Sequence, residues 1–336
     1  MHMADALLAP GVAGIMYACS TAAAGYSIHK LDKDKEDQLV PVMGVMGAFV
    51  FAAQMINFTI PGTGSSGHLC GGMLLTAVVG PYAAFLTMIG VLLIQCLLFA
   101  DGGLMALGAN AWNMAFYGCF VGALIWRAFM RKGITRKKII AASLLGCVLT
   151  LQLGAFSVTL ETLASGITEL PFTAFLAVMQ PIHLAIGLVE GAVTAAVLVF
   201  LQEARPSLLW QAESADSQKQ PMTLRGVLGV MAVLAAVTAG LLSLFASAFP
   251  DGLEWSLQRL TGSTELEATG SVQAFFARIQ SLTALLPDYN LAGSESAAGG
   301  SAAGLIGAAV VLAAVVLLGK IIKKAAHRNG STAPRH

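Results

Sequence analysis

Residues 69–100, LCGGMLLTAVVGPYAAFLTMIGVLLIQCLLFA, decide how often this chain crosses a membrane. A membrane-spanning helix needs about 20 apolar residues, so this stretch is long for one crossing and short for two. Gly80-Pro81 near its middle favours a break, because proline lacks the backbone N–H that a helix interior uses. We therefore expect two crossings here, with the chain returning to the side from which it entered.

The composition of the whole chain indicates an integral membrane protein. Of 336 residues, 57% are hydrophobic and 11% are charged, whereas about a quarter of a soluble domain is charged. A net charge of +1, without a basic tract that contains aromatics, excludes a nucleic-acid partner. Further apolar stretches long enough for a membrane helix occupy residues 6–28, 40–60, 108–130, 138–163, 172–203, 224–249 and 302–322.

The charges in the loops predict the orientation of the chain. Lys and Arg accumulate on the cytoplasmic side of membrane proteins. If 69–100 crosses twice and the N-terminus is outside, every Lys and Arg except Arg259 and Arg278 is cytoplasmic. A single crossing would instead place the cluster between Arg127 and Lys138 outside. We therefore predict an all-α protein of about nine transmembrane helices, with its N-terminus outside.

The polar residues between the apolar stretches divide the chain into parts. Residues 1–205 form a seven-helix membrane bundle, 206–222 a cytoplasmic linker, 223–325 a two-helix transmembrane hairpin and 326–336 a cytoplasmic tail. The outer loop of the hairpin, about 250–300, ends in GSESAAGGSAAG, a composition that predicts flexibility. The five cysteines form no CxxC pair and are interpreted as small buried residues.

The first two residues, Met1-His2, are the strongest candidates for a metal site. A free α-amine, the amide nitrogen of residue 2 and its imidazole can close two fused chelate rings on one ion. No basic segment precedes the first apolar stretch, so we expect an uncleaved N-terminus. A further imidazole would complete a square of nitrogens, which suits Ni²⁺ or Cu²⁺, and His68 follows a glycine-rich loop on the same predicted side.

Several polar residues near these candidates could support them from a second shell. They are Asp5, Asn57, Ser66 and Asn110. Asp5 and the asparagines also have simpler explanations: Asp5 could cap a helix, and the asparagines could link helices. The candidate ligand His68 could likewise bond only to the backbone. Asp101-Gly-Gly is explained by a turn.

His183 and Glu190 lie seven residues apart on one face of a predicted membrane helix. Ionisable groups are costly there and suggest function, although a hydrogen-bonded link between packed helices is the stronger explanation. As a relay, the pair would serve a proton-coupled secondary metal transporter. A membrane metal enzyme is a further alternative and would need an open coordination position.

Taken together, the motifs resemble the CbiM/NikM family, the substrate-binding membrane components of energy-coupling factor transporters for nickel and cobalt. The similarity extends over about residues 1–205, and a PDGLE motif of a fused N component follows at Pro250, Asp251, Gly252, Leu253 and Glu254. The matching segments are MHMADAL at 1–7, FVFAAQMINF at 49–58, GSSGHL at 64–69, ADGG at 100–103 with GANAWNM at 108–114, and HLAIGLVEG at 183–191.

The resemblance implies a metal-capture subunit of an ATP-driven importer in the prokaryotic cell membrane. It implies Ni²⁺ as substrate, with Co²⁺ a close second and no organic cofactor, and a site built from Met1, His2 and His68. The implied partners are a CbiQ/NikQ-like transmembrane T component and CbiO/NikO-like ATP-binding subunits. The chain itself has no Gly-x-x-x-x-Gly-Lys-Ser/Thr loop, so we expect it to be non-catalytic.

Overall fold

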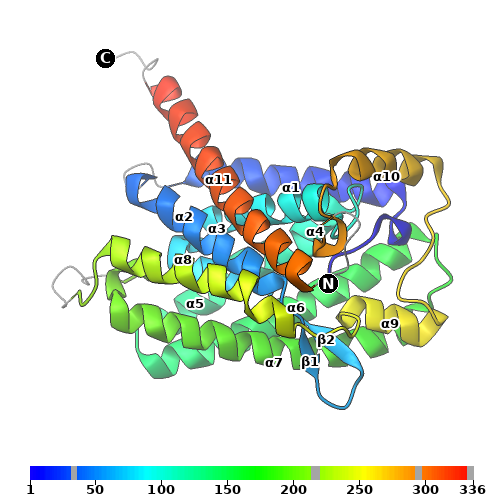
Figure 1. The fold of residues 1–336 in the computed structure, drawn as a ribbon, viewed down its shortest axis with the longest axis horizontal. Coiled ribbons are helices and arrows are strands. Elements are labelled where there is room, and N and C mark those ends of the chain that lie inside the picture. Colours follow the sequence, from blue (N-terminus) through cyan, green and yellow to red (C-terminus); the bar gives the residue numbers. More distant parts are fainter. Residues whose placement is uncertain (32–35, 213–219, 292–296, 331–336) are drawn as a thin grey trace.

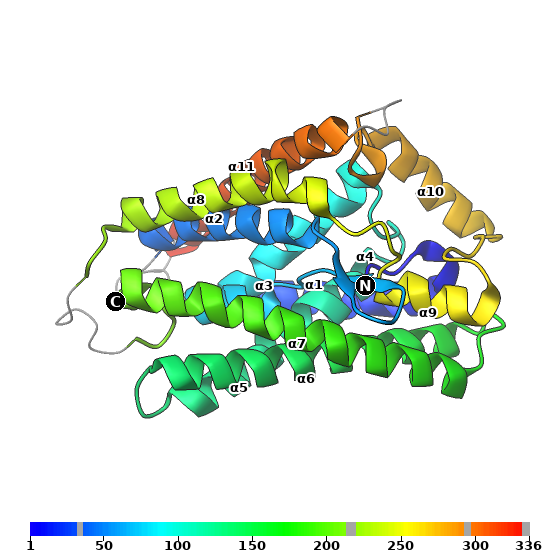
Figure 2. The same ribbon diagram turned by 60° about the horizontal axis from the view of Figure 1, so that its bottom comes forward.

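The computed structural model of the chain describes residues 1–31, 36–212, 220–291 and 297–330. Most long helices lie roughly along one direction, and α11 crosses them obliquely (Figure 1). The N-terminus lies among elements at one end of this bundle, together with α9, α10 and a β-hairpin (Figures 1 and 2). We call this the site end.

The elements follow one another along the chain with short connections. They are η1 (Asp5–Leu7), α1 (Pro10–Lys30), α2 (Glu36–Gln54), β1 (Phe58–Ile60), β2 (Ser65–Gly67), α3 (Gly72–Phe99), α4 (Leu107–Asn110), the π-helix η3 (Ala111–Val121), α5 (Gly122–Met130), α6 (Arg136–Ser165), α7 (Phe172–Ala204), η4 (Pro206–Leu208), α8 (Leu224–Gly240), η6 (Leu242–Phe245), α9 (Gly252–Thr261), α10 (Ser271–Thr283), η7 (Pro287–Tyr289) and α11 (Ala297–Gly330).

The helices confirm the predicted class, an all-α membrane protein. Among the described residues, five helical segments are long and apolar enough to span a membrane: Gly72–Phe99, Leu107–Met130, Arg136–Ser165, Phe172–Ala204 and Ala298–Ile322. Two shorter apolar helices, Gln38–Gln54 and Leu224–Gly240, accompany them. The predicted number of nine crossings is not confirmed by this count.

Helix α3 folds back on itself at Gly80. The backbone of Gly80 has φ 77° and ψ 166°, far from helical values. A straight helix of 28 residues would be about 42 Å long, yet segments at both of its ends contact the N-terminus. His68 Nε2 lies 3.0 Å from the Met1 amine, and Gln95 Oε1 lies 3.2 Å from His2 Nε2. The stretch 69–100 thus begins and ends at the same end of the bundle, as its sequence predicts.

Two apolar stretches are shorter as helices than the sequence suggested. Helix α2 ends at Gln54, and residues 58–60 pair with 65–67 as an antiparallel hairpin, with Phe58 opposite Gly67. Helix α1 begins only at Pro10, because proline suits the first helical position and the preceding residues take another path. Similarly, α8 ends at Gly240. The expectations of continuous helices over 40–60, 6–28 and 224–249 are therefore wrong at these ends.

The outer part of the C-terminal hairpin is more ordered than its composition suggested. It contains α9 and α10, and residues 297–304 form the first turns of α11. Of the segment 293–304, which we expected to be flexible, residues 293–296 lie outside the described residues, and the expectation is wrong for the rest. Small residues let α11 approach α2 closely: a Cβ on Gly307 would lie 2.3 Å from Phe51 Cζ.

Candidate metal centre

The first residues of the chain enter the bundle as an extended segment that is fixed by its backbone. The Asn110 side chain accepts a hydrogen bond from Met3 N at 2.7 Å and donates one to Met3 O at 3.1 Å. Gly103 N also donates to Met3 O, at 3.0 Å. Together these bonds bury Met1, which is only 6% exposed, and hold its amine in one place.

His68 is presented to this amine by the loop after β2. Its Nδ1 lies 2.9 Å from Leu69 O and donates to this carbonyl, which leaves Nε2 facing the Met1 amine. Nε2 lies 3.0 Å from the Met1 amine. Two buried side chains fix the loop itself: Glu190 Oε1 accepts from Gly71 N at 2.8 Å, and Gln54 Nε2 donates to Cys70 O at 2.7 Å.

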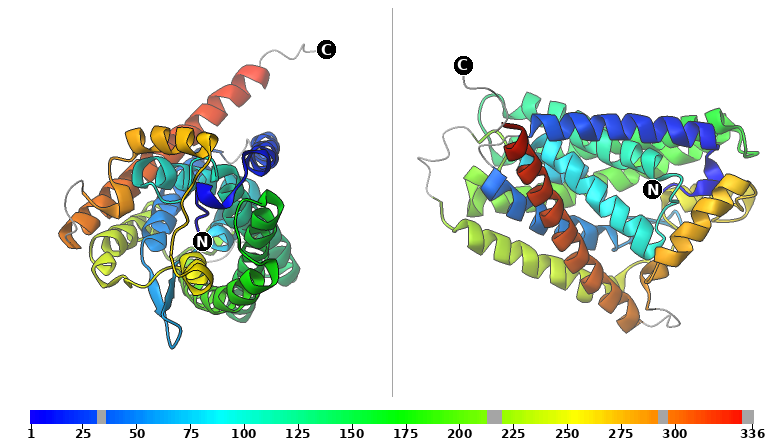
Figure 3. Two further views of the ribbon diagram at one scale, coloured as in Figure 1. Left: turned by 90° about the vertical axis from the view of Figure 1, so that its right-hand side faces the viewer. Right: turned by 90° about the horizontal axis from the view of Figure 1, so that it is seen from above.

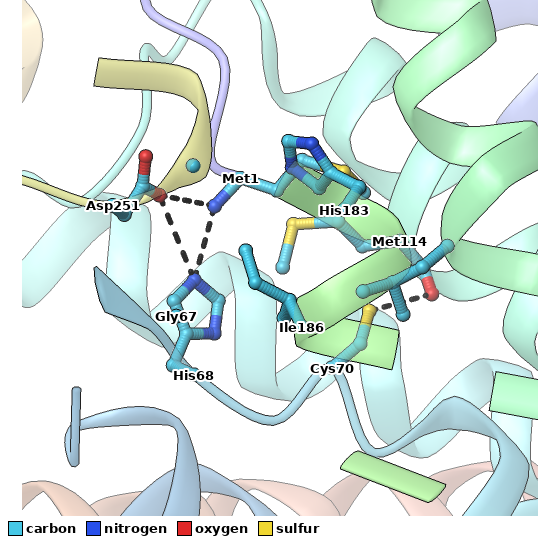
Figure 4. Close-up of a pocket in the computed structure, with 10 residues that line it drawn as sticks. Met1, Gly67, His68, Cys70, Met114, His183, Ile186 and Asp251 are labelled. Atoms are coloured by element: carbon cyan, nitrogen blue, oxygen red, sulfur yellow. Dashed lines mark hydrogen bonds and ion pairs between the residues drawn. The ribbon is translucent and has the colours of Figure 1, made fainter. Parts of the chain in front are cut away.

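A third group, the Asp251 carboxylate, reaches the same point from the C-terminal hairpin (Figure 4). Its Oδ1 caps helix α9 by accepting from Leu253 N at 2.8 Å and Glu254 N at 2.9 Å. Glu254 Oε2 accepts from Asp251 N in return, which completes a capping box. Asp251 Oδ2 forms an ion pair with the Met1 amine and lies 3.8 Å from His68 Nε2.

The turn that carries Asp251 is bound directly to the hairpin that leads to His68. Ser66 N donates to Pro250 O at 2.8 Å, and Ser66 Oγ donates to Phe249 O at 2.7 Å. Trp255 Nε1 donates to Thr63 O at 3.0 Å. Ser66 therefore supports the candidate site by joining the two parts of the chain.

The amine and the carboxylate shift each other's protonation. Burial by itself would lower the pKa of the Met1 amine, but the Asp251 carboxylate outweighs burial, and this pKa is raised. Burial would likewise raise the pKa of Asp251, but the Met1 amine and His68 hold it well below its usual value. At neutral pH the pair is therefore an ammonium bound to a carboxylate.

The His2 imidazole lies beside this pair in a closed ring of polar contacts. His2 Nδ1 is 3.0 Å from Asp101 Oδ1, and His2 Nε2 is 3.2 Å from Gln95 Oε1. Tyr289 closes the ring, because its hydroxyl donates to Asp101 Oδ2 at 2.5 Å and accepts from Gln95 Nε2 at 3.2 Å. Burial lowers the pKa of His2 to about 4, so its imidazole is neutral and its single N–H can donate to only one of these two oxygens. The centroid of this imidazole lies 5.4 Å from that of His68, with the two planes 23° apart.

Two cavities adjoin these groups. A small one of about 10 Å³, room for a single water molecule, is lined by Met1, His68, His183 and Asp251 among others (Figure 4). A larger one of about 470 Å³ is also lined by His68 and Asp251. Its walls include His2, Asn57, Asp101 and Glu254.

The remaining predicted residues lie around the site in different ways. Asp5 does not pair with the His2 imidazole; its Oδ1 accepts from Ala106 N at 2.9 Å, and Asp101 takes the position beside His2. His183 Nδ1 bonds to Met179 O at 2.8 Å, and its Nε2 has no hydrogen-bond partner among the described residues. Glu190 supports the His68 loop through Gly71.

Sequence reasoning missed three members of the His2 ring. Asp101 had been assigned to a turn, and Gln95 and Tyr289 had no role. A glutamine within an apolar membrane stretch is a usable signal, but nothing local connects Tyr289 to residues so far away in the chain. Among the described residues, no group of three or more His, Cys, Asp or Glu side chains is arranged to hold a metal ion. The candidate centre therefore depends on the nitrogens of the N-terminus.

Two family models match the chain. Residues 2–208 match CbiM, the cobalt uptake substrate-specific transmembrane region. Residues 225–324 match the PDGLE domain. The division falls within the segment between α7 and α8, and the PDGLE turn is the one that contacts Met1.

Similar proteins are fused chains of the same kind. A putative fused nickel transport protein NikMN of Archaeoglobus fulgidus is 37% identical, over 89% of this chain and 91% of its own length. The fused nickel transport protein NikMN of Rhodobacter capsulatus is 30% identical, over 88% and 90% respectively. A crystal structure of a transition metal transporter is 31% identical with a TM-score of 0.53, covering 60% of this chain and 93% of that one. The chain therefore belongs to the CbiM family, carries a PDGLE domain after its CbiM region, and is a multi-pass membrane protein.

Proposed function

We propose that this chain captures Ni²⁺, with Co²⁺ as a close second, for an ATP-driven importer of the energy-coupling factor type. The ligands would be the Met1 amine, the His2 amide and imidazole nitrogens, and His68 Nε2. The observation that carries the proposal is the 3.0 Å separation between the Met1 amine and His68 Nε2. With metal–nitrogen bonds of about 2.0–2.1 Å, adjacent corners of a square lie about 2.9 Å apart.

Metal capture would exchange contacts that the site already makes. One proton of the Met1 ammonium and the proton of the His2 amide would leave to solvent, because a metal ligand must be deprotonated. The His2 imidazole would turn its Nδ1 from Asp101 toward the ion, since this nitrogen closes the chelate ring with the amide. Asp251 would stay near a positive charge in both states, first the ammonium and then the ion.

The proposed preference for nickel follows from the donor set. Four nitrogens in a square, one of them a deprotonated amide, favour low-spin Ni²⁺ over Co²⁺, while Cu²⁺ binds most such sites more tightly. Selectivity against copper would depend on geometry and on the ions available. The similarity to proteins named for nickel transport supports this choice.

The chain would be a non-catalytic subunit. ATP hydrolysis would take place in separate ATP-binding subunits, which a transmembrane T component would couple to this chain. Membership of the CbiM family and the lack of a phosphate-binding lysine loop in the sequence support this assignment.

Replacing His68 with Ala tests the proposal against a matched control, His29→Ala. His29 lies in the last turn of α1 and is exposed, so its loss should leave binding unchanged. Equilibrium dialysis with Ni²⁺ should give one tightly bound ion in the wild type and in His29→Ala, and a loss of at least about a hundredfold in affinity in His68→Ala. Unchanged affinity in His68→Ala would refute the proposed ligand set.

A further inference from the structure

Helix α10 (Ser271–Thr283) turns its polar residues toward the protein. Gln273 is 5% exposed, and its Nε2 donates to Leu8 O at 3.2 Å. Gln280 donates from Nε2 to Cys96 O at 3.0 Å and to Gly102 O at 2.7 Å. The two glutamines are seven residues apart and therefore lie on one face of the helix. Gln280 thus binds backbone next to Asp101, and Gln273 binds backbone of the N-terminal segment.

The opposite face of α10 is apolar and exposed. Phe275 is 60% exposed and Leu282 is 76% exposed, and Val272 lies beside them. Leu285, just after the helix, continues the same strip. The helix of a water-soluble domain has the reverse arrangement, with its apolar stripe toward the core. An aromatic and a leucine held in water at these positions would be unfavourable.

The position of α10 identifies what covers this face. The helix lies on the rim of the bundle, between α1 and α11, alongside the end of α1 that is nearest the N-terminus (Figures 1 and 3). At the same end, the membrane-spanning α11 exposes Leu305 and Ile306. The apolar strip of α10 therefore continues the lipid-facing surface of the bundle.

We propose that α10 is an interfacial helix whose apolar face lies in the lipid leaflet at the site end. Such helices bury their apolar face about 5–10 Å below the head groups. Arg278 is exposed at the edge of this face, where its long side chain reaches the head-group phosphates. Lipid thus covers the apolar face of α10, which is opposite the two glutamines.

This placement connects the bilayer to the candidate metal centre. Gln280 and Ala277 line the larger cavity together with His2 and Asp101. Helix α10 thus forms one wall of that cavity. Its apolar face contacts lipid, and its two glutamines bind the protein backbone. The inference requires a membrane but does not depend on which ion binds.

Spin labels read out the environment of each face in the full-length protein. Cys19 is exposed, so its interpretation as a buried residue is wrong, and it is first changed to Ser. The other four cysteines are buried and stay. Labels are then attached at Phe275→Cys, Leu282→Cys and, as a matched control on the exposed flank, Ser281→Cys. The protein is reconstituted in vesicles of phosphatidylethanolamine and phosphatidylglycerol without added metal.

Power saturation compares collisions with oxygen, which concentrates in lipid, and with chromium oxalate, which stays in water. We expect the oxygen-to-chromium ratio at 275 and 282 to exceed that at 281 severalfold. Equal ratios at all three positions would place the face in water and overturn the proposal. Protection of 275 and 282 from both reagents would indicate a protein partner or a second copy, and would overturn it as well.

Discussion

Changing Asp251 to Asn should alter how many protons the protein releases when it binds Ni²⁺. Asn caps helices as well as Asp does, so α9 keeps its N-terminal cap, which Asp251 now provides through Oδ1. The change removes only the negative charge that faces the Met1 amine. Because that charge raises the pKa of the amine and burial lowers it, the pKa of the amine should fall below its usual value in the variant.

The size of the effect follows from proton linkage. In the wild type the amine stays protonated through about pH 8, so binding displaces one proton from it, and this proton alone makes the affinity rise about tenfold per pH unit, about 1.4 kcal/mol. The His2 amide releases a further proton on binding in the wild type and in the variant alike. In Asp251→Asn the amine no longer contributes to the pH dependence of the affinity once the pH exceeds its lowered pKa. At acidic pH, where the amine is still charged, the unpaired ammonium should lower the free energy of unfolding by about 1.5–3 kcal/mol. This loss should shrink as the pH rises and the amine becomes neutral.

Calorimetric titration with Ni²⁺ in buffers of different ionisation enthalpy counts the released protons. Near pH 8 the wild type should release up to one proton more than Asp251→Asn. Glu254→Gln is the comparison variant. Glu254 belongs to the same capping box but binds Asp251 N rather than the amine, and its charge raises the pKa of the amine less than that of Asp251 does, so its loss should reduce proton release less. Equal proton release by the wild type and Asp251→Asn would refute the role assigned to this ion pair.

Two glycine substitutions test the supporting structure. Gly80→Ala should destabilise the protein by about 1–3 kcal/mol in thermal unfolding. The reversal of α3 needs a positive φ at this residue, and a Cβ there would lie 3.1 Å from Trp210 Nε1. An unchanged melting temperature would contradict the fold-back at Gly80. Gly252→Ala should displace the PDGLE turn and cost about 1–3 kcal/mol, because a Cβ would lie 3.0 Å from His183 Cε1 and 2.8 Å from a neighbouring isoleucine. Gly229→Ala in α8 meets nothing within 4 Å and serves as the control; equal stability of the Gly252 and Gly229 variants would show that the turn is not tightly packed.

The sequence was sufficient for features that local chemistry dictates. Gly80-Pro81 within an apolar stretch predicted the reversal of α3, because few backbone conformations suit both residues. The distribution of Lys and Arg along the chain predicted that His68 lies on the side of the N-terminus, where Met1-His2 can chelate. The first prediction concerns a short segment whose behaviour depends little on the rest of the chain, and the second uses only the order of apolar and basic residues.

Other features depend on contacts between distant segments and could not be read from a local pattern. Asp5 was a reasonable partner for His2 by sequence distance, but the extended backbone at Ala4 and the short helix that follows direct its carboxylate to Ala106. The sequence identified Asp251 only as a member of the PDGLE motif. In the structure one oxygen caps α9 and the other binds the Met1 amine, which requires the docking of Pro250 on Ser66.

The same limit explains the error in the C-terminal hairpin. A run of glycine, alanine and serine resembles a flexible linker, but small residues also let helices pack closely in a membrane. Gly304 illustrates the second case, because a Cβ there would lie 2.7 Å from Met55 Cε and 3.0 Å from Ala239 O. Composition alone does not distinguish the two.

The central claim, that the N-terminal amine is a metal ligand, is tested most directly by adding one glycine before Met1. Intact mass spectrometry first establishes that Met1 is the first residue of the unmodified protein and glycine that of the variant. X-ray absorption at the nickel edge then reports the ligands. We predict that the unmodified protein binds one Ni²⁺ in a square of four nitrogens and that the extended protein, whose amine is displaced from Asp251 and His68, does not. The same four-nitrogen spectrum and affinity in the extended protein would contradict the claim.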